Sequence, residues 1–119
     1  LVRRNQISEI YNERLKHIEW LKTPLVDDFV YQTWWQYIVK IIDGRDRTEV
    51  LLKLLNKYDI PTANAYQPLC HQQKIYNNFL SKSGFKNSEH FITKIFSLPM
   101  YVELKDEQVN YICDCINKL

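Results

Sequence analysis

The chain has 119 residues, of which 45% are hydrophobic and 25% are charged, and its formal net charge at pH 7 is +2. This length suffices for one domain with a modest core, and the near-neutral charge gives no electrostatic reason to expect nucleic acid or a membrane surface as a partner. No apolar run approaches the roughly 20 residues that span a bilayer, and the first residues lack the apolar core of a signal peptide.

Two long elements are predicted in the first part of the chain. Residues 5–22 are expected to form a helix, because apolar residues recur at spacings of three and four with charged residues between them. Pro24 ends this pattern, since proline disfavours helix in the residue before it. Residues 29–42 alternate as in a long strand, whose odd-numbered positions form the buried face. This alternation predicts Trp35 in the core and Trp34 under a neighbouring domain.

Shorter elements follow. Asp46 and Glu49 have the spacing of a capping box and predict a helix that begins there. A short strand is expected at 62–67, a polar loop at 77–88, and then a helix capped by Ser88 that carries Phe91, Ile92, Ile95 and Phe96. A last helix is predicted over about 106–118. This alternation predicts an α/β (α+β) fold with a short, mostly antiparallel sheet and helices packed on it.

The cysteines and the first residue bear on where the protein works. An odd number of cysteines without a leader favours free thiols in a reducing compartment, so we expect a cytoplasmic protein. Cys113 and Cys115 are two apart on a predicted helix and point to nearly opposite sides, so no zinc or other metal site is predicted with Cys70 and His71. The chain begins at Leu1 rather than Met, from which we expect an excised fragment.

Three motifs follow one another in an order that is more specific than any of them alone. They are Trp35-Gln36-Tyr37-Ile38-Val39, then Tyr66 with Pro68-Leu69, His71, Gln73 and Tyr76, and finally Phe96-Ser97-Leu98-Pro99-Met100-Tyr101 with Asp106-Glu107-Gln108-Val109. In this order they resemble the C-terminal small domain of the DegT/DnrJ/StrS family of pyridoxal-phosphate sugar-nucleotide aminotransferases. The resemblance covers essentially the whole chain.

The resemblance implies a fold-type-I enzyme with two domains. Residues 1–22 would be the connecting helix and residues 23–119 the small domain that covers the substrate. The large domain, which holds pyridoxal phosphate on a lysine, would be absent. The parent enzyme would act as a homodimer and transfer an amino group, from glutamate, to a nucleotide-linked keto sugar in polysaccharide or glycan biosynthesis. The fragment alone would bind no cofactor, carry no catalytic residue and show no activity.

The segment 66–76, which turns at Pro68, is the predicted substrate contact. Tyr66, His71 and Gln73 offer a phenol, an imidazole and an amide, which suit sugar hydroxyls and diphosphate oxygens. Surface exposure of His71 and packing of Tyr66 are the plainer interpretations of the same residues. Two other functions stay open: a non-catalytic binding or interaction module that keeps this fold, and a dehydratase of the same family, in which a histidine replaces the cofactor lysine.

Overall fold

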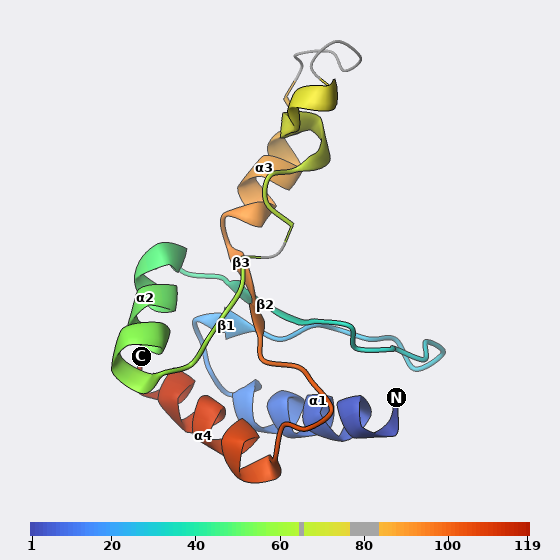
Figure 1. Cartoon of the computed structure of the whole chain (residues 1–119), viewed down its shortest axis with the longest axis vertical. Helices are drawn as coiled ribbons and strands as arrows, with labels where there is room; N and C mark the ends of the chain where they lie inside the picture. The colour runs from blue at the N-terminus through green and yellow to red at the C-terminus, as the bar shows by residue number, and fades with distance from the viewer. Residues whose placement is uncertain (65, 77–83) are drawn as a thin grey trace.

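The computed structural model describes residues 1–64, 66–76 and 84–119. The helices are α1 (Val2–Leu15), α2 (Arg47–Tyr58), α3 (Lys86–Ile92) and α4 (Asp106–Asn117), with two short 3₁₀ helices, η1 (Cys70–Gln72) and η2 (Lys74–Tyr76). The strands are β1 (Leu21–Lys22), β2 (Tyr37–Ile41) and β3 (Ile95–Leu98). In Figure 1, α1 and α4 lie side by side, and α3 projects away from them at the far end of the sheet. No helix in the described ranges combines the length and the apolar character that crossing a bilayer requires.

The predicted fold class is confirmed by the sheet. Its strand order is β1-β2-β3, and both pairings are antiparallel. Tyr37, Val39 and Ile41 on the central strand are buried, whereas Ile38 and Lys40 are half-buried on the opposite face. The alternation predicted for this part of the chain is therefore correct, and it gives β2 one face toward the core and one face away from it.

Two tyrosines join α1 to the sheet inside the core. The rings of Tyr11 and Tyr37 have their centroids 4.8 Å apart, and the Tyr11 hydroxyl donates to the Pro99 carbonyl oxygen at 2.9 Å. Burial raises the pKa of both phenols well above their ordinary value, so both stay neutral. The first helix therefore belongs to the same core as the sheet.

The first helix is shorter than predicted. It ends at Leu15 instead of residue 22, and Leu21–Lys22 form the edge strand β1. Ile18 and Leu21 keep the spacing of a helix and are both buried, but a turn and a strand bury them. The backbone of β1 pairs with β2, a long-range interaction that the local spacing does not encode.

The predicted strand at 29–42 is also wrong over most of its length. Only Tyr37–Ile41 is strand, and Phe29 and Tyr31 are exposed on a loop that projects from the body (Figure 1). Trp34 has a φ of 51°, a left-handed conformation that breaks the alternation of a strand. As a result Trp34 is 5% exposed and packs on Tyr37, while Trp35 is 71% exposed, which reverses the prediction for the two residues.

From the cap of α2 onward, some predicted elements are confirmed and others are not. The capping pair is confirmed, because the Asp46 carboxylate accepts from the Glu49 backbone N–H at 3.0 Å. Of the strand predicted at 62–67, the described residues form one bridge, between Ala63 and Ser97. Ser88 lies inside α3 and does not cap it.

The chain leaves the helical path after α3. Ile95 and Phe96, predicted in a helix, belong to β3, because their backbone pairs with β2. Of the predicted loop 77–88, residues 77–83 lie outside the described part.

The last helix is confirmed at Asp106–Asn117. Its predicted apolar face, Val109, Ile112, Cys113 and Ile116, is buried, and so is Cys115. Both cysteines are covered because α4 contacts α1 and α2. Burial raises the pKa of the Cys113 thiol to about 12, so this thiol is protonated and unreactive at neutral pH.

Candidate functional site

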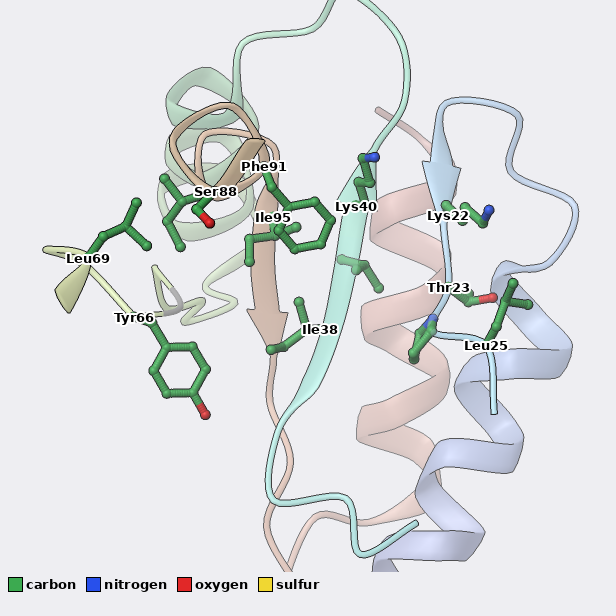
Figure 2. A pocket seen from close by; sticks show the side chains of 13 residues that line it. Lys22, Thr23, Leu25, Ile38, Lys40, Tyr66, Leu69, Ser88, Phe91 and Ile95 are labelled. Atoms are coloured by element: carbon green, nitrogen blue, oxygen red, sulfur yellow. The ribbon is translucent and has the colours of Figure 1, made fainter. Parts of the chain in front are cut away.

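A groove of about 650 Å³ lies on the face of the sheet opposite to α1 and α4 (Figure 2). Its size is within the range of small-molecule sites. The wall is mostly apolar and combines residues from the segment after β1, from β2, from the stretch before η1, from α3 and from β3: Leu25, Ile38, Tyr66, Leu69, Phe91 and Ile95. Five separate parts of the chain thus meet around one groove.

Every polar side chain that lines the groove can donate a hydrogen bond. Lys22 and Lys40 contribute ammonium groups, and Thr23, Ser88 and Tyr66 contribute hydroxyls. Among the described residues that line the groove there is no carboxylate. The Lys40 ammonium lies 5.2 Å from the centroid of the Phe91 ring, close enough for a cation–π contact. This wall suits a ligand that has both an anionic part and an apolar or planar part.

Tyr66 is the one predicted site residue that lines this groove. It lies at one end of the groove in Figure 2, and its side chain is 65% exposed. Its φ of 54° is left-handed, which is uncommon for a residue with a bulky side chain. Such backbone conformations cluster at ligand sites, and here the phenol is left available at the rim.

His71 and Gln73 lie outside the groove. The His71 Nε2 atom is 2.9 Å from Glu89 Oε1, and the imidazole ring lies against Phe85 with a centroid separation of 4.5 Å. The His71 side chain is only 16% exposed. Its contact with Glu89 links η1 to α3. Gln73 follows η1 and is exposed. The structure therefore does not bring the three predicted contacts together in one cavity.

Lys22, Lys40 and Phe91 are groove residues that the sequence analysis did not propose. The alternation of β2 places Lys40 beside Ile38 on the face opposite to the core, so a signal for Lys40 was present in the sequence. Lys22 had no such signal, because the predicted helix extended over it.

Comparison with known proteins gives the same fold and a family. An aminotransferase of the DegT DnrJ EryC1 StrS class from Brucella abortus has a solved structure that matches with a TM-score of 0.80 and 27% sequence identity, over 98% of this chain and 30% of its own. A family model described as the DegT/DnrJ/EryC1/StrS aminotransferase family matches residues 1–117. The chain belongs to this family.

Two curated relatives cover nearly all of the chain. The spore coat polysaccharide biosynthesis protein SpsC of Bacillus subtilis is 25% identical over an alignment of 122 residues that covers 98% of this chain and 31% of SpsC. A dTDP-3-amino-3,6-dideoxy-alpha-D-galactopyranose transaminase of Aneurinibacillus thermoaerophilus is 27% identical over 116 residues, which are 98% of this chain and 30% of the transaminase. The chain thus spans about a third of the length of these relatives.

Proposed function

We propose that the chain is the substrate-covering small domain of a pyridoxal-phosphate-dependent aminotransferase that acts on a nucleotide-linked keto sugar. The observation that carries this proposal is the family match over residues 1–117. The name of the Aneurinibacillus relative, a transaminase of a dTDP-linked amino sugar, supports the substrate class. The name of SpsC supports a place in polysaccharide biosynthesis.

The cofactor belongs to another part of the enzyme in this proposal. A pyridoxal-phosphate site needs an amine, donors to the phosphate and an acidic or basic partner for the pyridine nitrogen. The described lining of the groove offers amines and hydroxyls but no carboxylate or guanidinium group. These residues do not fit a resident cofactor, and we place it on a large domain of the whole enzyme, which we propose to be a homodimer.

The contribution of this chain is then to cover and position the substrate. The apolar wall of the groove excludes water from the bound ligand when the small domain covers the substrate. From the rim, the Tyr66 hydroxyl can donate a hydrogen bond to a sugar oxygen. Gln73 offers an exposed amide on the same segment. The contacts of His71 with Glu89 and Phe85 give it the role of holding that segment on α3.

The test compares the chain with the whole enzyme. The 119-residue chain is incubated with pyridoxal phosphate, dialysed, and examined for visible absorbance before and after borohydride. We expect no stoichiometric band. The full-length protein should show the band and, with glutamate, convert nucleotide-linked keto sugars to amino sugars that mass spectrometry detects. A reducible, stoichiometric band on the chain alone would contradict the proposal, and so would a full-length protein that aminates no member of a nucleotide keto-sugar panel.

A further inference from the structure

Two lysines occupy directly paired positions on neighbouring strands at the edge of the groove. Lys22 on β1 is the register partner of Lys40 on β2. Directly opposed residues of an antiparallel pair lie on the same face, with Cβ atoms about 4.5–5.5 Å apart. Two like charges in this arrangement repel each other and weaken the pairing. The placement therefore costs stability unless an anion lies between them.

No acidic side chain of the described chain neutralises this pair. The ion pairs formed within the described ranges involve other basic residues, and neither Lys22 nor Lys40 takes part in one. The described lining of the groove contains two lysines and no carboxylate. The Phe91 ring holds Lys40 over the groove without removing its charge.

We propose that Lys22 and Lys40 bind the diphosphate of a nucleoside diphosphate, an inference that rests on the proposed function with its nucleotide-linked substrate. Two ammonium groups on long side chains that start from directly paired positions can each contact one of the two phosphoryl groups. The Thr23 and Ser88 hydroxyls on the same wall supply further donors.

The rest of the groove suits the remainder of such a ligand. Ile38 and Phe91 provide an apolar and an aromatic surface beside the lysines, on which a planar base can stack. Tyr66 at the rim offers its phenol to a hydroxyl group of the sugar. The lysines, the Phe91 ring and the hydroxyls of Thr23 and Ser88 thus line the same groove, where one nucleotide ligand can use them together.

The experiment is a calorimetric titration of the full 119-residue chain with dTDP, UDP and inorganic diphosphate at low ionic strength. Lys22→Gln and Lys40→Gln are expected to weaken binding of dTDP or UDP about tenfold each, because each removes one charge-assisted contact. The matched control is Lys53→Gln, which removes the same charge from an exposed position on α2. Lys40→Arg should retain most of the affinity. Inorganic diphosphate should bind more weakly than the nucleotides, because it does not use the apolar wall.

Three results would overturn the inference: no saturable binding of dTDP or UDP by the unmodified chain, equal affinities in the groove variants and the Lys53 control, or nucleotide binding no tighter than that of inorganic diphosphate. Circular dichroism of each variant separates loss of binding from loss of fold.

A second readout separates this inference from the proposed function. In the full-length enzyme, Lys22→Gln and Lys40→Gln should raise the KM for the nucleotide sugar about tenfold, while the glutamate-dependent change in cofactor absorbance stays as in the unmodified enzyme. Amino transfer with an unchanged KM would overturn the diphosphate site and leave the function standing. Lysine-dependent nucleotide binding without amino transfer would support the site and overturn the function.

Discussion

The contact between His71 and Glu89 should control the stability of the segment that carries Tyr66. His71→Ala removes both the hydrogen bond to Glu89 and the ring contact with Phe85. His71→Phe keeps an aromatic ring beside Phe85 and removes only the hydrogen bond. Glu89→Gln keeps the size of the partner and removes its charge. The three variants therefore separate the two interactions.

The magnitudes follow from exposure and geometry. The Glu89 side chain is 39% exposed, so solvent screens the pair and its contribution is about 0.5–1 kcal/mol. The ring contact at 4.5 Å adds about 0.5–1 kcal/mol. His71→Ala should destabilise the segment by about 1–2 kcal/mol, and His71→Phe and Glu89→Gln by about half of that.

Hydrogen exchange measured by NMR is the assay, because the effect is local. The amides of Gln72, Gln73 and Tyr76 donate to carbonyl oxygens within the segment at 2.8–3.2 Å and report its opening. In His71→Ala they should exchange about 5–30 times faster, while the amide of Val39 in the central strand keeps its rate. Unchanged exchange in His71→Ala would refute the contact. Equal acceleration at Val39 would show that His71 supports the global fold and not this segment.

Two further predictions concern the core. Trp34→Ala should lower the free energy of unfolding by about 3–5 kcal/mol, because this side chain is 5% exposed, whereas the 71% exposed Trp35 should tolerate alanine within about 0.5–1 kcal/mol. Urea denaturation of the two variants compares them, and similar losses would contradict the assigned burial. For Cys113, the folded pKa of about 12 exceeds the ordinary value of 9.0, so above pH 9 the folded state binds more protons than the unfolded state and stability falls as pH rises. Cys113→Val should reduce this fall by up to about 1.4 kcal/mol per pH unit between pH 9 and 10.5, and an unchanged slope in urea denaturation would argue against the raised pKa.

The sequence predicted those parts of the fold whose periodicity and caps are local. The apolar face of α4, the Asp46–Glu49 cap and the buried face of β2 are all confirmed. Strand pairing is not local. The end of α1 at Leu15 and the start of β3 at Ile95 depend on backbone bonds to β2, and apolar spacing alone cannot distinguish these elements from continued helices. The left-handed Trp34 is a further case, since one residue reverses which of two adjacent tryptophans is buried.

The error at β1 also explains why the sequence analysis missed the lysine pair. A helix over residues 5–22 would place Lys22 on a solvated helical surface, where a single lysine indicates no ligand. Pairing of Leu21 with Ile41 instead fixes the register so that Lys22 lies opposite Lys40, and the alternation of β2 turns that pair away from Tyr37 and toward the groove. The same five residues of β2 thus serve the core on one face and the groove on the other. A shift of β1 by one residue would move Lys22 to the core face, where burial of its charge is unfavourable. The charge of Lys22 therefore helps to fix the register that creates the proposed diphosphate site.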